Sequence, residues 1–88
     1  MFAYLAEFLA TLFFAYIVLV TGNPLAIGGA LALGLLLSFR FSTVTVNPAL
    51  TITLAAAGKI PPKEVIPICT VQVLASLAAL EIFKRFNV

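Results

Sequence analysis

The spacing of the charged residues constrains the fold of this chain more than any other feature. Five Lys or Arg and three Asp or Glu occur in 88 residues, and none lies in residues 8–39, 41–58 or 65–80. The chain is 64% hydrophobic and 9% charged, whereas a soluble domain has about 25% charged residues. A chain this short cannot bury so much apolar surface in its own core. We therefore expect an integral, multi-pass membrane protein surrounded by lipid.

The same composition argues against several functional classes. A net charge of +2 provides no basic patch for nucleic acid. The sequence has one cysteine, Cys69, and no histidine, so it offers no internal disulfide, no zinc site and no Ser–His chemistry. We expect no enzymatic activity, no metal and no cofactor, and we interpret Cys69 as a small packing residue.

Two helices are expected in the first half of the chain. Residues 3–20 form an apolar stretch about long enough to cross ~30 Å of hydrocarbon. Because no basic residue precedes it and Glu7 lies early in it, we expect a retained span and not a cleaved signal peptide. The turn signal at residues 21–24 separates it from a glycine-rich second helix at 25–39, which is suited to close packing against protein.

The segment at residues 41–57 differs from the spans around it. Residues 42–47 are polar and β-branched, which disfavours a helix. Asn47 is a good N-cap and Pro48 a good first residue for a helix at 49–57. Nine helical residues cover only about half of a bilayer. The pattern therefore predicts a re-entrant loop followed by a half-helix.

The alternative for residues 49–57 is a helix lying flat at the membrane surface. Such a helix needs a charged face, and this one offers only Thr51 and Thr53, so we favour the re-entrant interpretation. A last helix is expected at 63–86, long enough to span with some tilt. The whole prediction for residues 1–88 is a single all-α unit with three transmembrane helices and one re-entrant half-helix.

Asn47-Pro48-Ala49, at the start of a half-helix between two spans, resembles the signature of the aquaporin family. Further segments resemble parts of that family in the same order: residues 6–11 its first helix, 26–34 its glycine-rich second helix, 54–60 the turn after its half-helix, and 71–76 its glutamine-bearing third helix. The resemblance covers nearly all of this chain but only half of an aquaporin. Family members contain two such units in inverted orientation, with their Asn-Pro-Ala half-helices meeting at the membrane midplane.

The resemblance implies that a second copy completes the fold in antiparallel orientation, because an isolated half would expose irregular backbone to lipid. Arg40, Lys59 and Lys63 are expected on one side of the membrane, and Lys84 and Arg85 on the other. This small difference in positive charge permits insertion in both orientations. Family members commonly form tetramers, which implies up to four such pores in an assembly.

In the implied pore, Asn47 of each copy projects its amide to the centre, and Pro48 and Ala49 complete the motif. Positive half-helix ends oppose cations there. The alternative role of Asn47 is that of a plain N-cap, and both roles are compatible. The carbonyls of the preceding loop supply hydrogen-bond acceptors; these belong to Thr43, Val44, Thr45 and Val46.

The positions that match the family's narrow filter are Ile27, Val44 and Leu50. Water-selective members have an arginine after one Asn-Pro-Ala motif, where this chain has Leu50, and they also have a histidine in the filter. Thr43 and Thr45 stand where the family usually has glycine and histidine. This aliphatic ring makes fast water selectivity doubtful and favours small neutral solutes such as glycerol-sized polyols or dissolved gases.

Two further residues are expected to support the loop. By resemblance, Glu7 accepts hydrogen bonds from loop amides; the alternative is a carboxylate at the membrane surface. Gln72 is interpreted in the same way, with an ordinary inter-helix hydrogen bond as its alternative.

These expectations lead to three hypotheses for function. The first is a passive channel for water or small neutral solutes, built from an antiparallel homodimer. The second is a non-conducting structural or assembly protein of the membrane that retains the aquaporin-like fold. The third is a pore completed by a different half-length partner.

Overall fold

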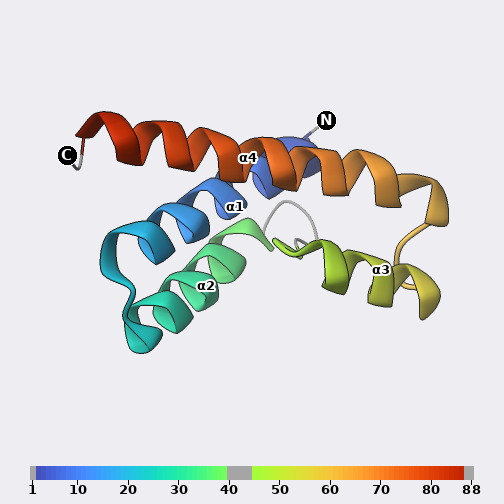
Figure 1. The fold of residues 1–88 in the computed structure, drawn as a ribbon. Helices are drawn as coiled ribbons and strands as arrows, with labels where there is room; N and C mark the ends of the chain where they lie inside the picture. The colour runs from blue at the N-terminus through green and yellow to red at the C-terminus, as the bar shows by residue number, and fades with distance from the viewer. Residues whose placement is uncertain (1, 40–44, 87–88) are drawn as a thin grey trace.

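A computed structural model describes residues 2–39 and 45–86, and the regular elements in these residues are all helical. In order, the elements are α1 (Phe2–Thr21), α2 (Pro24–Ser38), α3 (Pro48–Ala56), the short 3-10 helix η1 (Pro62–Glu64) and α4 (Val65–Phe86) (Figure 1). The predicted all-α class is thus confirmed for the described part of the chain. The short helix begins directly after Asn47, as the Asn-Pro pattern predicts.

Two helical stretches are long and apolar enough to cross a membrane, Ala3–Thr21 and Pro62–Phe86. α2 has 15 residues, a length of about 22 Å at 1.5 Å per residue, which is less than the ~30 Å of a hydrocarbon core. Of the three full spans that the sequence predicts, α2 is therefore the one that falls short within the described residues.

The turn between α1 and α2 has the chemistry that its sequence indicates. Gly22 follows α1 with a φ of 58°, a left-handed conformation that glycine adopts without steric cost. The Asn23 side chain then accepts hydrogen bonds from the amides of Leu25 (2.8 Å) and Ala26 (3.2 Å). With Pro24 in the first turn, these bonds cap the start of α2.

α1 is the central helix of the packing, since it contacts both α4 and α2, while α3 packs against α4 (Figure 1). Small side chains allow these close approaches: Ala10 of α1 is buried, and Ala75 and Ala79 of α4 are completely buried. The Tyr4 hydroxyl donates a hydrogen bond to the Glu64 carboxylate. This bond fastens the beginning of α1 to the segment that leads into α4.

The outer surface of the molecule is apolar on all four α-helices. Large hydrophobic side chains are strongly exposed at Leu25 (87%), Leu36 (71%) and Ile66 (77%). On α3, Leu50 is 50% exposed and Ile52 is 56% exposed. Water is a poor solvent for such a surface. A surface of this kind is consistent with an environment of lipid or of further protein.

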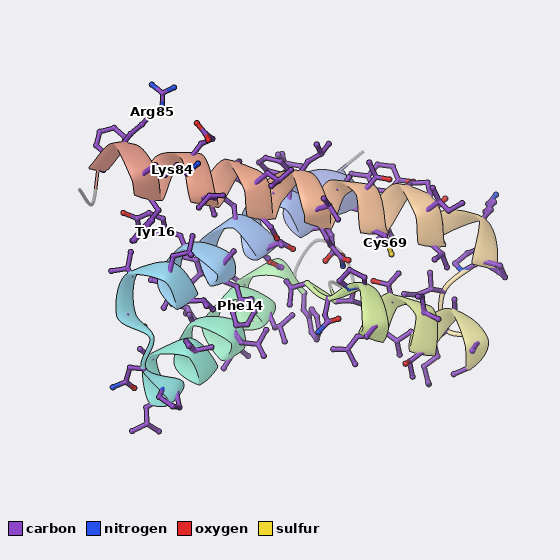
Figure 2. The ribbon with its side chains drawn as sticks, viewed as in Figure 1. Phe14, Tyr16, Cys69, Lys84 and Arg85 are labelled. Carbon is purple, nitrogen blue, oxygen red and sulfur yellow. The ribbon has the colours of Figure 1, made fainter. Side chains whose placement is uncertain are left out.

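Charged residues gather near the two ends of α4. Lys59, Lys63 and Glu64 precede it, and Lys84 and Arg85 lie in its last turn (Figure 2). Lys84 lies 4.0 Å from Glu81, and both side chains are exposed. Glu81 thus belongs to the group at the end of α4, and the charged residue among the described ones that lies outside both groups is Glu7, which is buried.

Candidate functional site

Four polar side chains from four separate segments meet in the interior. Glu7 comes from α1, Thr45 from the loop before α3, Thr51 from α3 and Gln72 from α4. Their relative exposures are 2%, 4%, 0% and 1%. Buried polar groups are usually hydrogen-bonded, and these four side chains bond to one another or to the loop, although Gln72 Oε1 has no partner among the described residues.

The Glu7 carboxylate accepts hydrogen bonds from the loop and from α4. The amide of Val46 donates to it at 2.6 Å, and the amide of Thr45 donates at 3.2 Å to both oxygens. Gln72 Nε2 donates at 3.0 Å. The contacts that the sequence predicts between Glu7 and the loop amides are therefore present, and Glu7 does not lie at the surface.

Val46 adopts a conformation that is unusual for its side chain. Its φ is 49°, in the left-handed region that a β-branched residue occupies only under constraint. Its side chain is buried against Ala10, with Leu31 and Leu35 of α2 beside it. The bond from its amide to Glu7 and this packing together hold the backbone in place.

The hydroxyls of Thr45 and Thr51 complete the cluster. Gln72 Nε2 lies 2.8 Å from Thr45 Oγ1 and 3.1 Å from Thr51 Oγ1, and the two hydroxyl oxygens are 2.6 Å apart. Gln72 thus contacts the loop, as the sequence predicts. The structure adds Thr51, which the sequence reasoning did not single out, and it gives Thr45 a side-chain contact where only its carbonyl was considered.

Asn47 and Pro48 form the start of α3. Asn47 Oδ1 accepts a hydrogen bond from the Ala49 amide at 2.7 Å, and the Asn47 carbonyl accepts one from the Thr51 amide at 3.0 Å. Pro48 occupies the first turn. The N-cap role of Asn47 is therefore present. All three motif residues are exposed in the single copy, at the positive end of the helix dipole.

The described positions that match the family's filter, Ile27 and Leu50, lie on different helices. Ile27 is half-buried near the N-terminus of α2. Leu50 is half exposed in the first turn of α3. Val44, and Thr43 among the loop carbonyls, lie outside the described residues.

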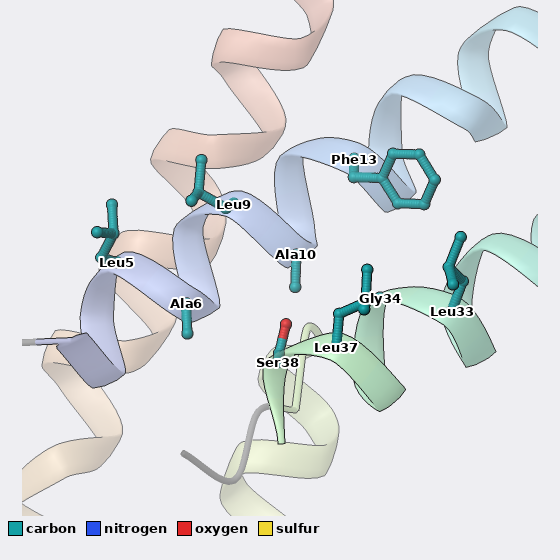
Figure 3. A pocket seen from close by; sticks show the side chains of 9 residues that line it. All are labelled: Leu5, Ala6, Leu9, Ala10, Phe13, Leu33, Gly34, Leu37 and Ser38. Carbon is teal, nitrogen blue, oxygen red and sulfur yellow. The ribbon is translucent and has the colours of Figure 1, made fainter. Parts of the chain in front are cut away.

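Two hollows adjoin this region. One of about 160 Å³ lies beside the motif and is lined by Val46, Pro48, Gln72, Val73, Ser76 and Leu77. The other, of about 510 Å³, lies between α1 and α2 (Figure 3). Its lining is aliphatic or aromatic except for Ser38, so it offers shape and apolar contact more than hydrogen bonds.

Comparison with other proteins gave no match to a family model, to a curated protein or to a solved structure.

Proposed function

We propose that this chain is a passive membrane channel for water or small neutral solutes, formed by an antiparallel homodimer, and a half-length relative of the aquaporins. The observation that carries the proposal is α3: a nine-residue helix capped by Asn47-Pro48, whose entering loop is fastened to a buried carboxylate. A short helix with a fixed, exposed N-terminus suits a pore better than a packing element.

The membrane setting is supported by two properties. The stretches Ala3–Thr21 and Pro62–Phe86 have the length and apolarity of spans, and large apolar side chains are exposed on every α-helix. In lipid, such side chains are in a favourable solvent.

The re-entrant interpretation follows from the length of α3. Nine residues extend about 14 Å, roughly half of the hydrocarbon core. Irregular backbone such as that of residues 45–47 is tolerated at membrane depth only where protein or a water-filled path covers it. In one copy, Asn47 and Leu50 are uncovered, so a second copy is needed to cover this end of α3.

Antiparallel pairing is supported by the charge distribution. Lys59 and Lys63 precede α4, and Lys84 and Arg85 lie in its last turn; the sequence predicts that Arg40, which is outside the described residues, lies on the same side of the membrane as Lys59 and Lys63. The orientation of a membrane protein follows the excess of Lys and Arg in its cytoplasmic segments. A chain with three such residues on one side of the membrane and two on the other therefore inserts in both orientations. The two Asn47 amides and the positive ends of the two α3 helices then face each other and disfavour cations.

Osmotic measurements on liposomes test this proposal. Purified protein is reconstituted, and volume changes are followed in water and glycerol gradients. We expect permeability above that of empty liposomes, and we expect Asn47→Asp to change it because a charge enters the pore centre.

The chain provides a matched control in Asn23, which also precedes a proline and caps a helix through its Oδ1. Asn23→Asp preserves a good N-cap away from the motif, so permeability should remain at the wild-type level. No permeability from folded protein inserted in both orientations would contradict the channel.

One observation favours a second candidate, a non-conducting structural membrane protein with this fold. Leu50, at the first turn of α3, is 50% exposed, and with Ile27 and Val44 it would make both pore mouths aliphatic. An apolar constriction can close by dewetting. Liposomes that contain stable dimers but show no solute flux would support this candidate. Flux that appears only with another membrane protein would indicate a different partner half.

A further inference from the structure

We propose that the hydroxyl pair of Thr45 and Thr51 positions the start of α3 by linking the Glu7–Gln72 contact to the carbonyl of Asn47. This inference rests on the proposed function where it concerns the pore, but the linkage itself concerns the geometry of a single copy. It assigns a positioning role to two side chains that flank the Asn-Pro-Ala motif, one on each side.

The donors of the cluster can be matched to acceptors one by one, while the carbonyl oxygen of the Gln72 side chain has no partner among the described residues. The Thr51 hydroxyl lies 3.0 Å from the Asn47 carbonyl oxygen and donates to it. With that proton used, the hydroxyl oxygen of Thr51 accepts the proton of Thr45 across 2.6 Å. Both hydroxyls therefore point toward the motif.

Gln72 supplies the remaining hydrogens. Its Nε2 group has two: one points to Glu7 Oε1 at 3.0 Å, and the other is shared between Thr45 Oγ1 and Thr51 Oγ1 at 2.8 and 3.1 Å. Glu7 fixes the amide in this orientation, because the opposite orientation would place two acceptors in contact.

The result is a continuous sequence of hydrogen bonds in one direction. Gln72, which also donates to Glu7, donates to the Thr45 hydroxyl. Thr45 donates to the Thr51 hydroxyl, and Thr51 donates to the Asn47 carbonyl. A rotation of α3 about its axis would break the contacts of the Thr51 hydroxyl with Thr45 and Gln72, whereas its bond to the Asn47 carbonyl lies within the helix and turns with it. The contacts of the Thr51 hydroxyl with the loop and with α4 therefore constrain the angle at which α3 begins.

A third buried threonine supplies the control. Thr11 of α1 is 3% exposed, and its hydroxyl has no hydrogen-bond partner among the described residues. Thr→Val removes a hydroxyl with little change of size, so the same substitution at positions 11 and 51 compares an unbonded hydroxyl with a bonded one.

The experiment measures amide hydrogen exchange in detergent micelles for the wild type and for Thr51→Val, Thr45→Val, Thr51→Ser and Thr11→Val. The amides of Val46 and Ala49 report on the loop and the cap. We expect Thr51→Val and Thr45→Val to accelerate their exchange about tenfold, as the loss of one hydrogen bond implies, while amides in the middle of α1 are unchanged. Thr51→Ser should retain slow exchange, and Thr11→Val should resemble the wild type at both amides.

The same variants in liposomes connect this geometry to transport. Thr51→Val is expected to lower solute permeability per inserted copy several-fold, with Thr51→Ser restoring it. Equal exchange rates in Thr51→Val and Thr11→Val, or a serine variant that behaves like valine, would overturn the positioning role. Liposomes without wild-type flux, combined with the expected exchange pattern, would refute the channel and leave the positioning role standing.

Discussion

At the scale of single residues, Glu7 is the group on which most other contacts depend. It receives three donors, from Thr45, Val46 and Gln72, and it is 2% exposed. Bonds to a charged acceptor contribute about 1.5–3 kcal/mol each, and a donor left unsatisfied costs a similar amount. Replacement of this one carboxylate therefore affects the loop and α4 together.

We predict that Glu7→Gln lowers the free energy of unfolding by about 2–3 kcal/mol, because the glutamine amide turns one donor toward the donors of the loop. Denaturant titration in mixed micelles measures this change. Glu81→Gln is the matched control: Glu81 is exposed with a single distant cation, so it should change stability by less than about 0.5 kcal/mol. Equal effects at both positions would exclude the supporting role of Glu7.

Val46 gives a second prediction, which concerns backbone strain. A non-glycine residue in the left-handed region costs about 1–3 kcal/mol, and Val46 has a φ of 49°. Val46→Gly removes that strain together with the side chain, whereas Val46→Ala removes the packing and keeps the strain. The glycine variant should therefore be at least as stable as the alanine variant, the reverse of the order expected at an ordinary position. The same denaturant titration compares the two.

The sequence provides part of this site but not all of it. Glu7 and Gln72 could be predicted because a carboxylate and an amide inside apolar helices require partners. Thr51 was missed because a threonine one turn into a helix usually bonds to its own backbone, and Thr51 does so as well. Its second bond, to Thr45, depends on the path of the loop, which no spacing in the sequence reveals.

At the scale of elements, the glycines separate into two kinds with opposite expected effects. Gly58 ends the segment after α3 with a φ of 79°, where an L-residue is strained. Gly34 lies within α2, and an added Cβ would meet Phe13 at 3.9 Å and Ala10 at 4.0 Å, ordinary contact distances.

We predict that Gly58→Ala destabilises the protein by about 1–2 kcal/mol, and that Gly34→Ala is tolerated or stabilises it by up to about 1 kcal/mol through helix propensity. Thermal unfolding in micelles, followed by circular dichroism, distinguishes the two signs. Destabilisation at Gly34 would mean that α1 and α2 approach each other more closely than described.

The element boundaries follow from local chemistry, which explains how far they could be predicted. Both Asn-Pro pairs start helices, and Gly22 and Gly58 follow helix ends, as the sequence indicates. α2 has the predicted 15 residues, but it begins at Pro24 and ends at Ser38, one residue earlier than the apolar run that continues through Phe39. Hydropathy describes the solvent of a segment and does not fix where its backbone turns.

At the scale of the whole molecule, the central prediction concerns orientation. Replacing Lys84 and Arg85 by alanine leaves cations only toward the other end of the unit, so the positive-inside rule should fix one orientation. The reciprocal variant, in which Arg40, Lys59 and Lys63 are replaced by alanine, should adopt the opposite orientation. A reporter fused to the C-terminus and assayed on both membrane faces measures this.

Each fixed-orientation variant alone is expected to lose most of its solute permeability, since antiparallel pairs cannot form. Expression of both variants together should restore it. Full permeability from either variant alone, with every reporter on one face, would contradict the antiparallel dimer. The sequence is least informative about how two copies are arranged. The residues of one chain indicate which of its surfaces are apolar, but they do not indicate what covers those surfaces.

The contact between Glu7 and Gln72 has a consequence for biosynthesis. The two residues are 65 positions apart, and at a ribosomal rate of ~5–20 residues per second Gln72 is made roughly 3–13 seconds after Glu7. Throughout that interval the carboxylate and the intervening loop lack the partner that closes their network. A pause in translation before α4 would therefore lengthen the time for which Glu7 and the loop remain without Gln72.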